Sequence, residues 1–372
     1  MQKDMHFWGT YVITRAAGVP MNDAHTIAYA AQYVDDSTQQ DSEQHEDGGL
    51  LYGIATAHHA LKSAANSVID REAQRRVWVP FHFIPGGMGK TLAEKLLCVK
   101  DSEIAQEMIT HHIAKAKEKT FALELIGIAA HVYMDTFSHY GFSGISSEYN
   151  AVKADSFKFF NVESGSRIEK YIKGKHSAFV EKYKEQIEQV HNFFAGIKSS
   201  VAEAGSGALG HAGVVTYPDR PFLHWQVEFE RARADKLSNR NNPQTYLEGC
   251  EKLHGYLSEF ARERYEQPEI VPFENIKGEV EKIIQFQGAK EERIDKWKQA
   301  ITERTVYAPE EGEAKETKYE ASLWEEEKEG FHNATSSSEG IDTNVYRFHQ
   351  AAAFHRYYVL KDLLPKHNIA VY

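Results

Sequence analysis

The chain has 372 residues, of which 42% are hydrophobic and 26% are charged. These values are ordinary for folded globular proteins, so the composition excludes a wholly disordered chain, a collagen and a long coiled coil. The formal net charge of -11 argues against a binder of duplex nucleic acid, because such binding relies on Lys and Arg that neutralise phosphates. We therefore expect no duplex nucleic acid among the partners, whereas a small nucleotide substrate is compatible with this charge.

Cysteine usage and hydropathy limit the class of protein further. Only Cys98 and Cys250 are present, and neither lies in a CxxC motif, which excludes a disulfide framework. The N-terminal stretch lacks the apolar run of a signal peptide, and no stretch approaches 18 consecutive apolar residues. We expect a soluble, cytoplasmic protein without a transmembrane segment.

Helical periodicity recurs along the chain, and strand alternation does not persist. Pro20 and Asp23 mark the start of a helix that ends around Val34. Further helices are expected at about 102–117, 121–140, 166–204, 243–264, 273–303 and 343–364. The polar segment 37–49 is expected to be a surface loop, and 77–87 a buried extended connection. The pattern predicts an all-α fold built as a multi-helix bundle.

Composition also suggests three parts of the chain. Residues 1–306 are expected to form a helical metal-binding domain. Residues 307–340 are acidic and poor in aliphatic side chains, so we expect a flexible insertion that is dispensable for folding. Residues 341–372 are expected to add a C-terminal helix that packs on the main domain.

Nineteen histidines make metal binding a central question, and three chemically suited residues share one helix. His131, Asp135 and His139 follow one another in steps of four residues, which places them along one stripe of an α-helix. The surrounding residues are apolar, so the stripe should be buried, and buried imidazole and carboxylate groups need partners. The pattern predicts a metal site, with ordinary core hydrogen bonds as the alternative.

Other candidate ligands are spread over the first 220 residues. His211 and Asp219 bracket a turn fixed by two prolines, although Asp219 can equally pair with the adjacent Arg220. Asp35 and Asp36 end a helix, where a nearby cation would offset the unfavourable helix dipole, and the sequence does not choose between them. The remaining candidates are His6, the pair His58 and His59, and His82, whose aromatic and proline neighbours imply burial.

The order of these residues resembles that of the zinc-dependent phospholipase C and P1 nuclease superfamily. That family has an early His, an Asp, a His, a helix with His-x3-Asp-x5-His, and a final His followed by a carboxylate. The matching residues here are His6, Asp35 or Asp36, His59 or His82, His131, Asp135, His139, His211 and Asp219. The spacing after Asp135 is two residues shorter, and the chain begins with Met1 where the mature family members begin with a metal-binding Trp. The run HYGFSG at 139–144 is similar to that of a bacterial branch of helical proteins without an established activity.

The resemblance implies two or three zinc ions and a phosphoester hydrolase. His131, Asp135, an early Asp and His59 or His82 would hold one zinc, and His139, His211 and Asp219 a second, with Asp135 bridging both. Such ions activate a water for attack on a small phosphodiester, a nucleotide or a phospholipid headgroup. Asp35 or Asp36 is the expected general base, and Arg220 the expected phosphate ligand. Aromatic residues beside these ligands are expected to line a pocket or to pack in the core: Phe7, Trp8, Phe81, Phe83, Tyr140, Phe142 and Trp225.

Two other classes of function fit the same residues. One is a different metal-dependent hydrolase or a di-iron oxidoreductase, because carboxylate and His ligands on helical bundles also suit iron. The other is a noncatalytic helical protein with a structural metal. A site closed by four protein ligands would favour the structural role, and an open position would favour an enzyme. The lack of any His-Asp dipeptide argues against an HD-type phosphohydrolase.

Overall fold

The computed structural model describes residues 1–57, 72, 74–153, 156–182, 214, 216–230 and 237–371. Helices dominate this part of the chain, so the expected helical class is confirmed, and small sheets accompany them. None of the helices described is both long and apolar enough to cross a bilayer.

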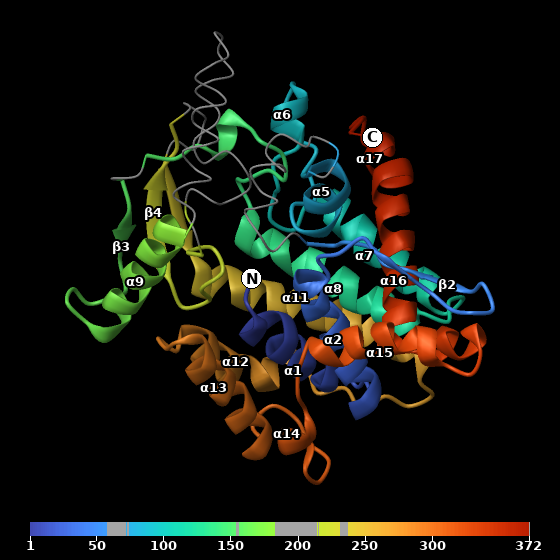
Figure 1. The fold of residues 1–372 in the computed structure, drawn as a ribbon. Helices are drawn as coiled ribbons and strands as arrows, with labels where there is room; N and C mark the ends of the chain where they lie inside the picture. The colour runs from blue at the N-terminus through green and yellow to red at the C-terminus, as the bar shows by residue number, and fades with distance from the viewer. Residues whose placement is uncertain are drawn as a thin grey trace.

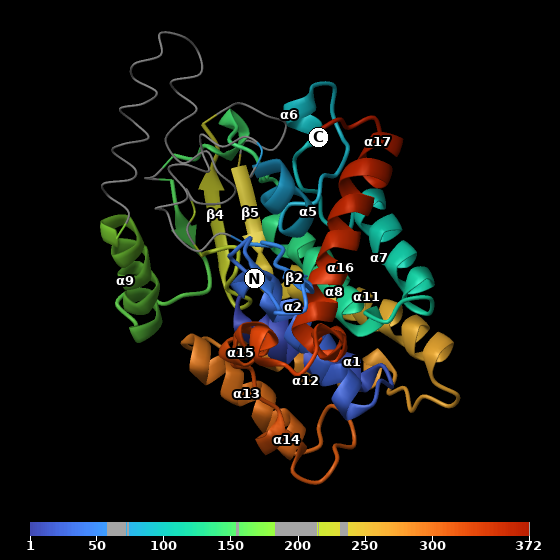
Figure 2. The same cartoon turned by 45° about the vertical axis from the view of Figure 1, so that its right-hand side comes forward.

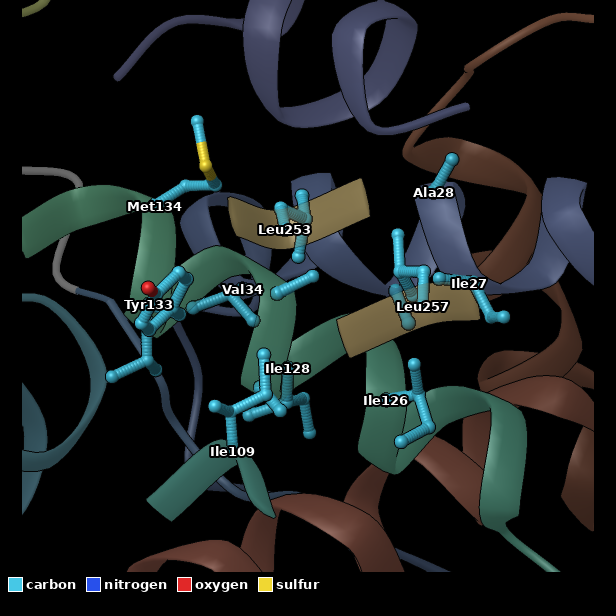
Figure 3. Packing of buried hydrophobic residues seen from close by; sticks show 14 of the residues in the cluster. Ile27, Ala28, Val34, Ile109, Ile126, Ile128, Tyr133, Met134, Leu253 and Leu257 are labelled. Carbon is cyan, nitrogen blue, oxygen red and sulfur yellow. The ribbon is translucent and has the colours of Figure 1, made fainter. Parts of the chain in front are cut away.

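Helix α8 (Ala122–His139) crosses the centre of the molecule, and four long helices pack around it (Figure 1). These are α2 (Met21–Asp36), α7 (Glu103–Ala116), α11 (Asn242–Arg264) and α16 (Asn344–Tyr357). Every residue of α8 except Leu123 is buried, as its nearly uniform apolar sequence predicts. Figure 3 shows the contact between these helices, where Ile27 of α2, Ile109 of α7, Ile128 of α8 and Leu257 of α11 contribute to one core.

The remaining helices surround this centre. In chain order they are η1 (Asp4–Gly9), α1 (Thr10–Ala16), η2 (Gln74–Trp78), α5 (Val79–Phe81), α6 (Leu92–Lys95), η3 (Glu148–Asn150), α9 (Arg167–Lys182), α12 (Phe273–Gln285), α13 (Lys290–Thr302), α14 (Glu313–Glu316), α15 (Ser322–Gly330), η6 (Phe331–Asn333), η7 (Ser337–Asp342), η8 (Tyr358–Leu363) and α17 (Leu364–Lys366). Helices α12, α13 and α14 gather at one end of the molecule, and α17 with the C-terminus lies at the other (Figure 2). The predicted helix at 273–303 is thus two helices, α12 and α13.

Two antiparallel sheets lie beside the bundle in the described part of the chain. Strand β1 (Ser42–Gln44) lies within the region 37–49 that was expected to be a loop, and it pairs with β2 (Leu50–Tyr52), which follows that region. Strands β3 (Lys158–Phe159), β4 (His224–Glu228) and β5 (Leu237–Asn241) form the second sheet in that order. Trp225 of β4 lies opposite Arg240 of β5 and packs in a second core cluster, which places Arg240 beneath the end of α8.

Helices α2 and α8 approach each other unusually closely at Gly127. A Cβ atom at this position would lie 2.4 Å from the carbonyl oxygen of Ile27 and 2.6 Å from Cβ of Ala30. Such distances are shorter than van der Waals contact, so only glycine permits this approach. The crossing brings the C-terminal end of α2 against the His131 turn of α8, because His131 lies one turn beyond Gly127.

The segment expected to be an extended connection at 77–87 is helical in its first part. Residues Gln74–Trp78 form the π-helix η2, and Val79–Phe81 continue as α5. Pro80 has no N–H to donate to the preceding turn, and the change from π-helix to α-helix lies next to it. The chain leaves the helix at His82.

Residues 307–340 pack on the bundle, which differs from the expected flexible insertion. Trp324 is 4% exposed and lies against Tyr29 and Tyr33 of α2, with ring centroids 4.2 and 4.9 Å away. The buried Glu313 carboxylate accepts hydrogen bonds from Tyr11 and from Arg15. A few aromatic and charged contacts fix the segment, and its low aliphatic content does not predict these contacts.

Candidate metal centre

Seven acidic and histidine side chains and one amino group converge where η1, α2, α8 and the 79–83 segment meet. They are the amino group of Met1, His6, Asp35, His82, His131, Asp135, His139 and Asp219. Two sets of three have ligand atoms within 4.8 Å of one another: His6, His131 and Asp135, and Asp35, His82 and His131. This part of the structure can therefore hold a metal ion.

His82 and His131 face each other through the ring nitrogens that do not contact a backbone carbonyl. His131 Nδ1 lies 2.7 Å from the carbonyl oxygen of Ala31, and His82 Nε2 lies 2.8 Å from that of Thr56. A carbonyl accepts only, so both of these nitrogens carry the ring hydrogen. In the neutral rings His82 Nδ1 and His131 Nε2 are then unprotonated, and they lie 3.2 Å apart. Carbonyl contacts of this kind are typical of histidines that bind a metal through the other nitrogen.

Asp135 lies in the middle of the cluster and is fully buried. Its Oδ2 is 3.2 Å from His131 Nε2, 3.5 Å from His82 Nδ1 and 3.4 Å from His139 Nδ1. Its Oδ1 is 2.8 Å from the amino nitrogen of Met1 and 3.2 Å from His6 Nε2. Burial alone would raise the pKa of this carboxyl, but the neighbouring His139, amino group, His131 and His6 hold it well below its usual value. Asp135 is thus a carboxylate with one oxygen directed to each half of the cluster.

A second close contact, between His139 and Asp219, lies on the other side of Asp135. His139 Nδ1 is 2.9 Å from the carbonyl oxygen of His82, so it carries the hydrogen, and the opposite Nε2 faces Asp219 Oδ1 at 3.1 Å. The Met1 amino nitrogen is 3.3 Å from the same Asp219 oxygen. Burial lowers the pKa of this amino group, but Asp135, Asp219 and Asp35 together raise it to about 11. The protonated Met1 amino group therefore already puts one positive charge next to Asp135 and Asp219.

His6 stacks on His131, with ring centroids 3.8 Å apart. His6 is buried, its Nδ1 has no hydrogen-bond partner in the described part of the chain, and its Nε2 lies 3.2 Å from Asp135 Oδ1. Burial and the proximity of His131 keep the pKa of His6 well below its usual value, so the ring is neutral. A neutral, buried imidazole with a free lone pair is a chemically suitable metal ligand.

The two consecutive aspartates of α2 have different surroundings. Asp35 lies 3.8 Å from His82 Nδ1 and 4.0 Å from both His131 Nε2 and His6 Nε2. Burial raises the pKa of Asp35. Asp36 instead accepts hydrogen bonds from Tyr319, at 2.6 Å, and from Gln32. Of the two, Asp35 joins the histidine cluster, whereas Asp36, which the sequence offered as a ligand, lies outside it.

Two buried arginines fix the segments that carry the ligands. Arg293 of α13 forms a bidentate ion pair with Asp4 and also donates to Gln2, which holds η1 and Met1 in place. Arg240 donates to the carbonyl oxygens of Ser138 and Tyr140 at the end of α8. A cation at a helix C-terminus is favourable, and this one fixes the turn that bears His139.

A cleft of about 740 Å³ opens onto the cluster. Its lining includes the ligand candidates Met1, Asp35, His82, His139 and Asp219. The other lining residues are Gln2, Lys3, Gln32, Asp36, Ala57, Trp78, Phe83, Thr216, Lys290, Tyr319, Glu320 and Ala321. Part of the cluster is therefore accessible from this cleft.

Several residues expected at the site lie elsewhere. Arg220 is 1% exposed, is absent from the cleft lining, and donates to Thr216 while its guanidinium lies over the Tyr171 ring. Of the aromatic candidates only Phe83 lines the cleft, and the others are buried in the core apart from Tyr140, which lies beneath Arg240. His58, His59 and His211 lie outside the described residues.

The Met1 amino group, Arg240 and Arg293 belong to the site or its support without having been expected there. Arg240 and Arg293 occur in amphipathic or polar surroundings, where an arginine is ordinarily solvent-exposed. No local pattern signals their burial.

Comparison with known proteins places the chain in a family. A model described as a family of unknown function, DUF6765, matches residues 1–363. The chain belongs to the DUF6765 family. The match includes every ligand candidate described above. Searches of curated proteins and of solved structures find no match.

Proposed function

We propose that this chain is a metal-dependent phosphoester hydrolase. The observation that carries the proposal is the 3.2 Å contact between His82 Nδ1 and His131 Nε2, whose other nitrogens both donate to carbonyl oxygens. In the neutral rings two lone pairs at this distance repel each other unless a proton or a metal cation lies between them. Asp35 and Asp135 supply negative charge at the same point, so the donor set suits zinc or a similar divalent ion.

A second ion is supported by the contact between His139 Nε2 and Asp219 Oδ1. When the His139 ring is neutral both atoms are acceptors, and the Met1 ammonium beside them would have to lose a proton or move for an ion to bind. Asp135, His139 and Asp219 would hold the second ion, and His6 would be a further ligand. The proposed complement is therefore two or three zinc ions, as the resemblance to phospholipase C and P1 nuclease implies.

The cleft favours an enzyme over a purely structural metal. Asp35, His82, His139 and Asp219 all line it, so a substrate can reach the ligands directly. Catalytic metal sites keep such an open position, whereas structural sites are closed by protein ligands. Divalent ions, when bound, activate water and neutralise the phosphoryl oxygens of the ester.

The chain's own residues would bind the substrate and take the proton. The Asp35 side chain is 29% exposed and lies farther from the histidine nitrogens than Asp135 does, so its carboxylate would accept the proton of the attacking water. Lys3 and Lys290 line the same cleft and would bind the phosphoester in the place that the sequence suggested for Arg220. Trp78 and Phe83 would contact the apolar part of the substrate.

The test combines metal content with turnover. Protein purified without chelators should contain two or three zinc-like ions by elemental analysis. The loaded protein should hydrolyse bis-p-nitrophenyl phosphate, phosphatidylcholine or single-stranded nucleic acid, and Asp135→Asn should lose both ions and activity. Lys290→Ala should raise KM and leave the metal content unchanged. Stoichiometric metal without turnover on any of these substrates would instead support a structural metal site.

A further inference from the structure

A second group of histidines lies near the proposed metal centre but does not line the cleft. His355 of α16 is fully buried, and its Nε2 lies 2.8 Å from the carbonyl oxygen of Pro80. The carbonyl accepts, so Nε2 carries the hydrogen and Nδ1 is an acceptor. His112 of α7 donates to that Nδ1 from its own Nε2, at 2.9 Å. This contact fixes both the tautomer and the orientation of the His355 ring.

The bond to Pro80 acts on the backbone segment that supplies His82. Pro80 lies in α5, and His82 follows two residues later. The His82 ring faces His131, and the His82 carbonyl oxygen accepts from His139 Nδ1 at 2.9 Å. A shift of this short segment would therefore displace one ligand directly and a second through its hydrogen bond.

Helix α16 also supports the segment on the other side of His82. His349 Nδ1 accepts from the backbone N–H of Ile54 at 3.1 Å. Two residues further on, the Thr56 carbonyl oxygen accepts from His82 Nε2, and Thr56 Oγ1 donates to Val34 at the end of α2. Histidines of one C-terminal helix thus contact both backbone segments that fix the His82 ring.

We infer that His355 is a positioning residue of the metal centre, which acts through Pro80 on His82 and His139. This inference rests on the metal site of the proposed function and not on the reaction. The group has no role in the cleft, because neither His112 nor His355 lines it. Outer hydrogen-bond partners of metal ligands typically change metal affinity by about 10- to 100-fold when they are removed.

The test measures metal affinity and the geometry of the ligands. Apo protein would be titrated with Co²⁺, and both Kd and the visible d–d spectrum would be recorded for wild type and variants. We expect His355→Leu to weaken Co²⁺ binding about tenfold and to shift the spectrum. We expect His355→Gln to restore both, because its amide nitrogen can donate to Pro80. Should the Leu variant fail to fold, His355→Asn, whose side chain is too short to reach Pro80, takes its place.

The matched control is His254→Leu. His254 is also a buried histidine that donates to a backbone carbonyl, that of Val271 at 2.9 Å, but it lies in α11 away from the ligands. A similar loss of thermal stability in both variants, with Co²⁺ affinity and spectrum unchanged in His355→Leu, would overturn the inference. Wild type that binds no Co²⁺ would overturn both the inference and the proposed metal site. Co²⁺ binding without phosphodiester hydrolysis would overturn only the proposed reaction.

Discussion

Asp35 and Asp36 are neighbours in sequence, yet their carboxylates belong to different environments. Asp35 faces His82, His131 and His6 at 3.8 to 4.0 Å, whereas Asp36 accepts the hydroxyl hydrogen of Tyr319. The last turn of α2 therefore separates a carboxylate that faces the histidine cluster from one that holds the segment around Tyr319 against the helix.

This difference makes the two residues a matched pair for mutagenesis. Asp35→Asn is expected to lower phosphodiester hydrolysis by about 100-fold or more, because general bases contribute about 10² to 10⁴ in rate. It should also weaken metal binding, since it removes a negative charge beside two histidines. Asp36→Asn is expected to keep the metal content and most of the rate. The reverse ranking of the two variants would contradict the assignment of Asp35.

The approach of α2 to α8 can be tested at Gly127. Gly127→Ala would place a Cβ atom 2.4 Å from the Ile27 carbonyl oxygen, so the helices would have to separate. We expect a loss of stability of about 1 to 3 kcal/mol, as for other overpacked cores. Metal affinity should also fall, because Asp35 and the Ala31 carbonyl move with α2. Chemical denaturation and metal titration measure the two effects.

Gly255 of α11 provides the control for this substitution. It lies in a helix and has open space where its Cβ would be. Gly255→Ala should therefore stabilise the protein by about 0.5 to 1 kcal/mol, the ordinary helix propensity difference. Equal effects of alanine at both glycines would show that the approach of α2 to α8 is not tight.

The packing of residues 307–340 can be tested at Trp324. Its ring is 4% exposed and contacts Tyr29, Tyr33 and Phe348. Trp324→Ala should cost about 3 to 5 kcal/mol of stability, as is usual for a buried aromatic side chain. The adjacent Leu323 is 46% exposed, so Leu323→Ala should change stability by less than about 0.5 kcal/mol. If Trp324→Ala left the thermal unfolding transition unchanged, residues 307–340 would be dispensable for folding, as their composition predicts.

Glu124 predicts a pH dependence of stability. Burial raises the pKa of this carboxyl to about 7, partly offset by a bond to its own backbone and by Arg347 and Arg264 nearby. Between about 4.5, the value in the unfolded chain, and about 7 the folded state holds the extra proton, so stability falls as the pH rises through this window. Glu124→Gln should therefore be more stable than wild type by about 1 to 3 kcal/mol at pH 8 and similar to it at pH 4.5.

Glu103 serves as the control, because it is exposed in the first turn of α7. Glu103→Gln should change stability by less than about 0.5 kcal/mol at both pH values. Denaturation of the three proteins at pH 4.5 and 8 gives the comparison, and a constant difference between Glu124→Gln and wild type would argue against a titration of Glu124 in this range.

The stripe His131, Asp135 and His139 could be predicted because helical geometry alone brings residues four apart onto one face. The boundaries of α8 followed from the same periodicity. The start of α7 followed from the Ser102 cap, which accepts from the Ala105 amide. The choice between Asp35 and Asp36 could not be predicted, because it depends on how α2 crosses α8 at Gly127. That crossing is a contact between elements 100 residues apart and leaves no local pattern.

Burial of charged residues was the other feature that local patterns missed. Arg240 and Arg293 are buried because each finds acceptors far away in sequence, and Glu313 is buried because it finds donors far away in sequence. Composition also gave a poor account of residues 307–340. A segment with few aliphatic side chains can still be held by one tryptophan and one buried carboxylate, and averages over the segment conceal both.

The ion pair between Asp4 and Arg293 has a consequence for how the protein is made. Its two residues are 289 positions apart, and it holds the segment that bears Met1 and His6. During synthesis Met1 and His6 leave the ribosome long before Arg293, and α16 follows later still. The histidine and carboxylate cluster can therefore acquire its final geometry only when nearly the whole chain has been made.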